Sequence, residues 1–234
     1  MTALTPLNFR EASSIFQYII EKKNVKYSTR SKDIDVFTSN GLCNLPDGYP
    51  ASMPSPRVGH TLASSSASNR VFMCGGYSAS ETRIDSINKV SKQCFILDLE
   101  TNQWRSLPDL KMGVSYATSI YIETRKRLMI IGGYHNKQKV NYVQILDLDA
   151  QEWRLSLVHY PLATFGHCSV SVSDSVIFST GGWNDVGGDL TSTFSLETGK
   201  TGESNAGGWQ KVSSMRVGRA THACLATRYK VKQH

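Results

Sequence analysis

Six histidines are the residues of this chain best suited to binding a metal ion, and three of them follow a pattern. His60, His167 and His222 each stand at the same place in a recurring stretch that runs on into small and apolar residues. Imidazole is the commonest metal ligand in proteins, but equivalent positions of a repeat lie one in each unit and need not converge. We therefore expect each histidine to be hydrogen-bonded within its own repeat, with no metal site and no cofactor.

Two carboxylates, Asp98 and Asp147, could be taken for a pair that performs general acid–base catalysis. Asp98 precedes Trp104 by six residues, and Asp147 precedes Trp153 by the same number. This shared offset indicates that the two carboxylates stabilise equivalent turns of a repeat. No GxSxG, HExxH or P-loop pattern is present. The sequence therefore predicts a protein that is not an enzyme.

The chain has five cysteines: Cys43, Cys74, Cys94, Cys168 and Cys224. No CxxC pair occurs, which gives a zinc or redox site little support. Cys74 and Cys94 lie 20 residues apart, on what should be neighbouring strands, so a disulfide between them is one alternative. The alternative that we favour is two free, buried thiols, because cysteine is a common small hydrophobe in strands.

The formal net charge of +7 raises the question of nucleic-acid binding. The basic residues are divided among the N-terminal segment, the stretch Arg125-Lys126-Arg127 at an expected hairpin tip, and the C-terminal tail. No aromatic residues alternate with these clusters to stack bases. We therefore expect solvated basic faces and no nucleic-acid partner.

The sequence gives no sign of a membrane partner or of secretion. It contains no run of 18 or more apolar residues, and Met1 to Arg10 lack a basic start followed by an apolar core. No Asn-x-Ser/Thr sequon occurs either. A cytoplasmic protein is the expectation.

A glycine pair recurs three times, each time after an apolar run and before an aromatic residue. The three pairs are Gly75-Gly76, Gly132-Gly133 and Gly181-Gly182, and the aromatic residues that follow them are Tyr77, Tyr134 and Trp183. A tryptophan trails each copy, at Trp104, Trp153 and Trp209. The glycine pairs are spaced by 57 and then 49 residues, and the tryptophans by 49 and then 56. A period near 50 indicates a repeat of small β-sheets.

These repeats divide the chain into segments. Residues 1–33 form an N-terminal lead-in, with a helix expected from Glu11 to Lys23. Residues 34–234 form the repeat region. Three complete units are expected at 57–107, 113–157 and 165–212, with partial strands at 34–50 and 216–228.

The repeats resemble the kelch family. Pro56, Arg57 and His60 match its opening, and the glycine pairs and the Asp…Trp endings match the rest. The resemblance implies an all-β propeller with four-stranded antiparallel blades around a channel. In that family the glycines tighten the turn beside the channel, and the tryptophan packs between neighbouring blades.

Three full blades and two partial ones are fewer than a family ring of five to seven. An open ring would leave apolar blade faces in water, at a cost of about 12 kcal/mol if roughly 500 Å² were exposed. An incomplete product is the interpretation that we favour. A second copy that completes the ring, or a joining of the two partial ends, are the alternatives.

Recognition of a protein or peptide partner is the predicted function, because loops on a rigid scaffold carry binding residues. The candidate binding rim comprises Arg57, Tyr77, Tyr134, Trp183 and Arg219. Aromatic residues and arginine are the types found at binding hot spots. The alternative for the aromatic residues is that they pack on the next blade. The alternative function is a carbohydrate-active or copper-oxidase enzyme on the same fold.

Overall fold

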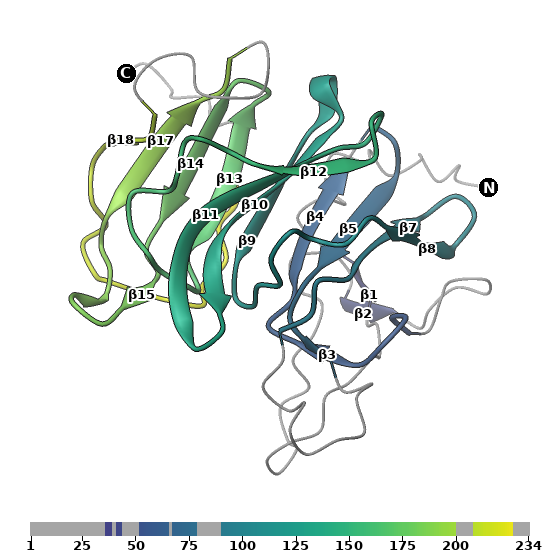
Figure 1. The fold of residues 1–234 in the computed structure, drawn as a ribbon, viewed down its shortest axis with the longest axis horizontal. Helices are drawn as coiled ribbons and strands as arrows, with labels where there is room; N and C mark the ends of the chain where they lie inside the picture. The colour runs from purple at the N-terminus through teal and green to yellow at the C-terminus, as the bar shows by residue number, and fades with distance from the viewer. Residues whose placement is uncertain are drawn as a thin grey trace, which may run out of the picture.

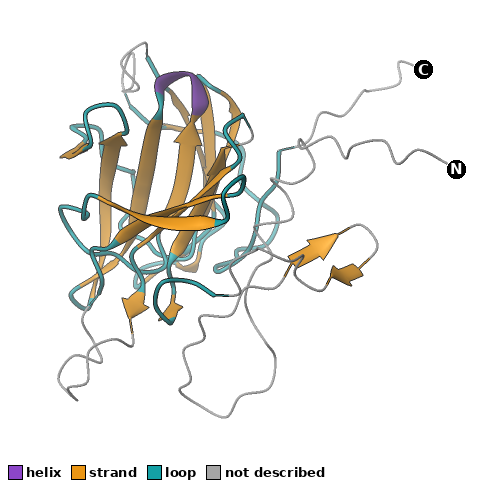
Figure 2. Ribbon diagram, turned by 90° about the vertical axis from the view of Figure 1, so that its right-hand side faces the viewer, coloured by secondary structure: helices purple, strands orange, loops and turns teal. Residues whose placement is uncertain are grey.

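The computed structural model describes residues 36–38, 41–43, 52–65, 67–78, 90–199 and 208–226. The helix expected between Glu11 and Lys23 lies outside these residues. Within them, a single turn of 3-10 helix at Glu123–Arg125 accompanies a fold made of strands (Figure 2). The prediction of an all-β protein is confirmed.

Three four-stranded antiparallel sheets make up most of the fold, and we call them the first, second and third blades. The first blade has the order β4-β5-β7-β8, with bounds Thr61–Ser65, Arg70–Cys74, Cys94–Asp98 and Gln103–Leu107. The second has the order β9-β10-β11-β12, with bounds Thr118–Ile122, Arg127–His135, Gln138–Asp147 and Glu152–Leu155. The third has the order β13-β14-β17-β18, with bounds Cys168–Ser173, Val176–Thr180, Thr193–Glu197 and Gln210–Lys211.

Three shorter pairs of strands accompany the blades. β1 (Val36–Thr38) pairs with β2 (Gly41–Cys43), β3 (Arg57–Val58) with β6 (Tyr77–Ser78), and β15 (Trp183–Asn184) with β16 (Gly188–Asp189). The last two pairs lie just beyond the glycine pairs of the first and third blades. They hold the residues that follow the glycines in a fixed position.

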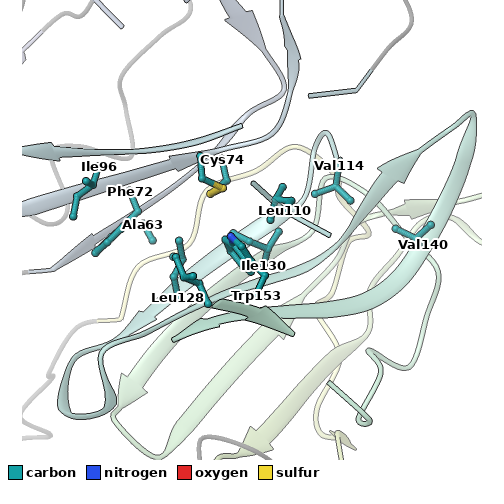
Figure 3. Close-up of a cluster of buried hydrophobic side chains, with 12 residues drawn as sticks. Ala63, Phe72, Cys74, Ile96, Leu110, Val114, Leu128, Ile130, Val140 and Trp153 are labelled. Atoms are coloured by element: carbon teal, nitrogen blue, oxygen red, sulfur yellow. A yellow bond between two sulfur atoms is a disulfide. The ribbon is translucent and has the colours of Figure 1, made fainter. Parts of the chain in front are cut away.

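The blades stand side by side in chain order, with a hydrophobic core between each two (Figure 1). Phe72 and Ile96 of the first blade face Leu128, Ile130 and Trp153 of the second (Figure 3). A second core joins the second and third blades, and its members include Met129, Ile131, Ile145, Ile177, Phe194 and Leu196.

Strand β10 shows why an unbroken apolar run marks a central strand. Leu128 and Ile130 point into the core shared with the first blade, whereas Met129 and Ile131 point into the core shared with the third. Alternate side chains of a strand face opposite ways, so a strand that is covered on both sides needs apolar residues at every position.

The third blade is covered differently. In β14, Ile177 and Ser179 are buried toward the second blade, whereas Val176, Phe178 and Thr180 are only half-buried. Its strands β13 and β18 also end in exposed residues. Among the described residues, the third blade therefore has one fully covered face.

The inner edge of the fold is a chain of backbone hydrogen bonds that passes from one repeat to the next. Tyr116 N–H donates to Gly59 C=O at 2.7 Å, Gly166 N–H to Tyr116 C=O at 2.8 Å, and Thr221 N–H to Gly166 C=O at 2.6 Å. All four residues have positive φ, between 51° and 67°. They stand at the same place, just before the first strand or the segment equivalent to it. The backbone hydrogen bonds at this position align each repeat with the next.

The segment expected to open a fourth unit lies at the edge of the third blade. Residues 212–226 contain no assigned strand in the described structure. In each blade the first strand pairs with the second strand of its own sheet. Residues 219–224 instead contact the third blade through backbone hydrogen bonds and a disulfide.

Candidate binding surface

Each glycine pair is the point where the next repeat meets the blade. Gly76 N–H donates to Val114 C=O at 2.8 Å, Gly133 N–H to Thr164 C=O at 2.9 Å, and Gly182 N–H to Arg219 C=O at 2.9 Å. A Cβ on Gly75 would lie 2.2 Å from the Val114 oxygen. The pair is therefore glycine for two reasons, since both residues have positive φ and the neighbouring backbone leaves no room for a side chain.

The aromatic residues after the glycine pairs meet two further aromatic rings. Tyr77 lies 6.5 Å from Tyr116 between ring centroids, and Tyr116 lies 5.9 Å from Phe165. Phe165 in turn lies 6.0 Å from Tyr134 and 5.7 Å from Trp183. All five rings are partly exposed. We call this continuous row the aromatic surface.

Backbone pairing between strand ends holds the rings in place. Tyr134 exchanges two backbone hydrogen bonds with Ser115, the residue before Tyr116. Trp183 donates its N–H to Phe165 C=O at 2.9 Å. The residue after each of these two glycine pairs is thus fixed beside the segment that precedes the first strand of its own blade.

Lys139 of β11 joins the aromatic surface from the side. Its ammonium group lies 4.6 Å from the ring centroid of Trp183 and 6.0 Å from that of Tyr134. It also forms an ion pair with Asp185 at 2.6 Å, and only 17% of its side chain is exposed. The ion pair links the second blade to the third and neutralises the charge of Lys139. No motif in the sequence marks Lys139, because its role depends on a ring in another repeat.

The structure corrects the placement of Arg57, which was expected at the rim. Arg57 is 2% exposed. Its guanidinium donates to Gly75 C=O at 2.8 Å and to Ser91 Oγ at 3.0 Å, and it lies over the ring of Phe95. Burial lowers the pKa of Arg57 to about 10. Because its donors are directed into the first blade, Arg57 contributes to the core and is not part of the surface.

Arg219, the other predicted arginine, is placed differently. Its backbone carbonyl receives the Gly182 N–H and its own N–H donates to Leu190 C=O at 3.2 Å. Its side chain is exposed. The backbone of Arg219 is therefore bonded to Gly182, the residue before Trp183, and Arg219 lies at the edge of the aromatic surface.

The repeated histidines pack against the neighbouring repeat. His167 stacks on Tyr160 at 4.9 Å between ring centroids, and its Cε1 lies 2.8 Å from where a Cβ on Gly132 would be. Among the described residues, neither ring nitrogen of His167 or His222 has a hydrogen-bond partner. The expectation of hydrogen bonds within each repeat is wrong for these two, because the ring faces the glycines of the preceding blade.

The two repeated aspartates stabilise hairpin turns, as expected. Asp98 accepts backbone N–H bonds from Glu100 and Thr101, each at 3.1 Å. Asp147 accepts the equivalent bonds from Asp149 and Ala150, also at 3.1 Å. These backbone hydrogen bonds lower the pKa of both carboxyl groups. In the described residues, no three His, Cys, Asp or Glu side chains gather to hold a metal ion.

The basic side chains of the β9–β10 turn bind other residues of the protein. Arg125 donates to Thr198 Oγ1 at 2.8 Å, which links the second blade to the third. Lys126 pairs with Asp149 at 3.0 Å, and Arg127 pairs with Asp147 at 3.4 Å. This cluster thus has acidic and hydroxyl partners of its own.

The described residues contain two disulfides, and one joins the cysteines that were expected to be free. Cys74 and Cys94 face each other across β5 and β7, with 4.2 Å between their Cα atoms. Cys168 and Cys224 are joined across 56 residues, with 5.9 Å between their Cα atoms. The alternative that we favoured, free thiols at Cys74 and Cys94, is therefore wrong.

The described part of the chain contains no helix long and apolar enough to cross a membrane. The Kelch-repeats domain of KLHDC2/KLHL20/DRC7 matches residues 24–231. A stretch of 56 residues is 36% identical to a RING finger domain and kelch repeat-containing protein of Dictyostelium discoideum, and covers 24% of this chain and 6% of that protein. A stretch of 92 residues is 29% identical to an F-box/kelch-repeat protein of Arabidopsis thaliana, and covers 38% of this chain and 21% of that protein.

The matched stretches therefore span a small part of either relative. The domain match, in contrast, extends over most of this chain and over all three blades. Glycine pairs, blade-facing tryptophans and Asp-stabilised turns recur in the order that the resemblance implied. The chain belongs to the kelch-repeat family.

Proposed function

We propose that this chain is a non-catalytic module that binds a protein or peptide segment on the aromatic surface. The observation that carries the proposal is the continuous row of five partly exposed rings, which come from all three blades. Aromatic side chains dominate binding energy at protein interfaces because they bury a large area at a small cost in side-chain entropy.

The rigid positions of the rings support the proposal. Each predicted ring follows a glycine pair whose backbone is hydrogen-bonded to the next repeat. Little conformational freedom is then lost when a partner binds. Tyr77, Tyr134 and Trp183 are retained from the sequence prediction, with Arg219 at the edge, and Tyr116, Phe165 and Lys139 are added.

The relatives are consistent with a recognition module. In each, kelch repeats share a chain with another kind of domain, a RING finger in one protein and an F-box in the other. We propose that the repeats of this chain likewise supply recognition. Self-association to complete the ring stays a prediction. A cytoplasmic location also stays a prediction, and the two disulfides argue against it, because disulfides are rare in a reducing compartment.

Selection from a displayed library of random peptides tests the proposal. The peptides selected on the wild-type protein are synthesised, and their affinities are measured by fluorescence anisotropy. We expect W183A and Y134A each to weaken binding by about 2 kcal/mol, which is roughly a 30-fold higher Kd.

The matched control is V172A, which removes an apolar side chain that is 51% exposed at the far end of β13. It should leave the affinity unchanged. Thermal melts show whether each variant is folded. Selected peptides that bind W183A and Y134A as tightly as wild type would place the binding site elsewhere.

A further inference from the structure

The Cys168–Cys224 disulfide lies at a position that two other repeat junctions fill with hydrogen bonds. Cys168 comes two residues after Gly166, just as Thr61 follows Gly59 and Thr118 follows Tyr116. Cys224 comes three residues after Thr221, just as Ser119 and Ser169 follow Tyr116 and Gly166. The two cysteines are therefore equivalent to a Thr and a Ser of the other junctions.

Those Thr and Ser residues meet across the junctions. Thr61 Oγ1 donates to Ser119 Oγ at 2.8 Å between the first and second repeats. Ser169 N–H donates to Thr118 Oγ1 at 3.1 Å between the second and third. At the next junction, the cysteines form a covalent bond in the same place. One junction is therefore closed by a disulfide, whereas the other two are closed by hydrogen bonds.

Besides this bond, the segment is held by the packing of His222 on Gly181 and by a few backbone hydrogen bonds. Thr221 N–H bonds to Gly166 C=O, and Arg219 exchanges backbone bonds with Gly182 and Leu190. Most of residues 219–226 are exposed, and none is in a strand. A segment with few buried apolar groups and few backbone bonds opens locally at low cost. The disulfide therefore contributes much of what holds this segment on the third blade.

We propose that Cys168–Cys224 is a redox latch that keeps residues 216–226 docked on the third blade. Cys224 is half-buried and lines a surface hollow, whereas Cys168 is 4% exposed. The Cys74–Cys94 disulfide differs, because both of its residues are 1% exposed within the first blade. A dithiol therefore reduces the latch and spares the disulfide in the blade.

The exchange follows ordinary thiol–disulfide chemistry. A thiolate of the dithiol attacks Cys224 Sγ, the S–S bond breaks, and Cys168 leaves as a thiolate that takes up a proton. The second thiol of the reagent then displaces Cys224 as a thiol and closes a cyclic disulfide. Two electrons pass to the protein, and the dithiol is oxidised.

Release of the segment reaches the aromatic surface through Arg219. The Arg219 carbonyl holds Gly182, and Gly182 precedes Trp183. Opening of residues 216–226 therefore removes a backbone bond next to one of the five rings. This consequence for binding rests on the proposed function of the surface, whereas the latch itself does not.

Hydrogen–deuterium exchange of the native protein, with and without dithiothreitol, tests the latch. Alkylation with iodoacetamide and peptide mapping report which cysteines are reduced. We expect Cys168 and Cys224 to be alkylated while Cys74 and Cys94 remain joined. Peptides from residues 181–190 and 216–226 should then exchange on the order of tenfold faster, with β10 and β11 unchanged.

The variant C168T/C224S restores the residue pair of the other junctions without a covalent bond. It should exchange like the reduced wild type and should not respond to dithiothreitol. Unchanged exchange in the reduced wild type would overturn the proposal, even if the variant failed to fold. So would free thiols at Cys168 and Cys224 in protein purified without reductant, or an intact bond until the protein unfolds.

Failure of the latch and failure of the binding proposal give different results. The exchange experiment uses no ligand, so a negative result does not bear on the proposal that the aromatic surface binds a partner. If W183A binds the selected peptides as wild type does, the surface proposal fails while the latch stands. If both proposals hold, the selected peptides bind the reduced protein more weakly than the oxidised protein.

Discussion

The burial of His167 predicts that the stability of this protein depends on pH. Its ring is stacked on Tyr160 and has no hydrogen-bond partner in the described structure. Burial, with a smaller contribution from His222, lowers the pKa of His167 to about 3. In the unfolded chain a histidine has a pKa of about 6.5. Between these values the unfolded state binds a proton that the folded state does not, so stability is lost as the pH falls below about 6.5.

The variant H167Q should remove this pH dependence. From pH 7 to pH 5, the wild-type protein should lose about 2 kcal/mol of unfolding free energy through this one histidine. H167Q should be less stable at pH 7 but should lose correspondingly less on acidification. Urea unfolding at the two pH values measures the difference.

His60 adds a similar effect, because burial lowers its pKa to about 4. The difference between wild type and H167Q isolates one histidine from the other. H159Q, at an exposed position, is the control and should follow the wild type. Equal losses for wild type and H167Q would mean that His167 becomes protonated in the folded protein.

At the scale of residues, the sequence predicted the position of a side chain where that position depends on a local pattern. Tyr77, Tyr134 and Trp183 follow glycine pairs, and in the structure they are connected through Tyr116 and Phe165. Tyr116 and Phe165 were missed, although Tyr116 stands where Gly59 and Gly166 stand in other repeats. Arg57 was misplaced because its burial depends on Gly75, Ser91 and Gln93, which come from distant parts of the blade.

At the scale of elements, the glycine pair is both a turn and an interface. Its positive φ values allow the turn, and its missing side chains allow the next repeat to approach. These two roles can be separated, because the chain contains a glycine with only the first. Gly188 has φ of 60°, and nothing lies within 4 Å of a Cβ added there.

We expect G75A to cost far more stability than G188A. Alanine at positive φ costs about 1–2 kcal/mol at either site. At Gly75 the added Cβ would also displace the Val114 carbonyl and break the junction between the first and second blades. A total of about 3–5 kcal/mol is expected for G75A. Chemical denaturation of both variants measures it, and similar losses would show that the turn alone requires glycine.

The strands were predicted best where both faces are covered. β5 and β10 are continuous apolar runs, and their positions follow directly from that pattern. β18 has only two residues, both exposed, and carries no comparable apolar pattern. The opening segment near His222 resembles a first strand in sequence, but its described part, up to residue 226, forms none, because pairing with a second strand is a tertiary contact.

At the scale of the whole molecule, stability should be highest in the middle. The second blade is packed on both faces, whereas the third has one face half-covered in the described structure. In a repeat protein, each unit is stabilised chiefly by its neighbours. The order of protection along the chain should therefore follow the number of covered faces.

Hydrogen exchange of the oxidised protein tests this order. Amides of β10 and β11 should exchange at least about tenfold more slowly than those of β14 and β17. The first blade should lie between them, since Met53 packs on its outer face against Met73. Equal protection of all three blades would instead show that the chain opens as one cooperative unit.

The kelch repeat could be recognised from the sequence, whereas the connections between repeats could not. Three glycine pairs in register were enough for the blades and their order. The Cys168–Cys224 bond went unnoticed because its partners are 56 residues apart. Only an alignment of the repeats shows that Cys168 is equivalent to Thr118 and that Cys224 is equivalent to Ser169.

The backbone chain along the inner edge has a consequence for how such proteins evolve. Its donors and acceptors belong to Gly59, Tyr116, Gly166 and Thr221, four positions with three kinds of residue. Because the bonds use only N–H and C=O groups, the junction tolerates substitution of the side chain where the backbone geometry persists. Each repeat accepts from the repeat that follows, always in the same direction. A duplicated repeat can therefore be inserted with a compatible junction at both ends, and its loops can then diverge toward a new partner.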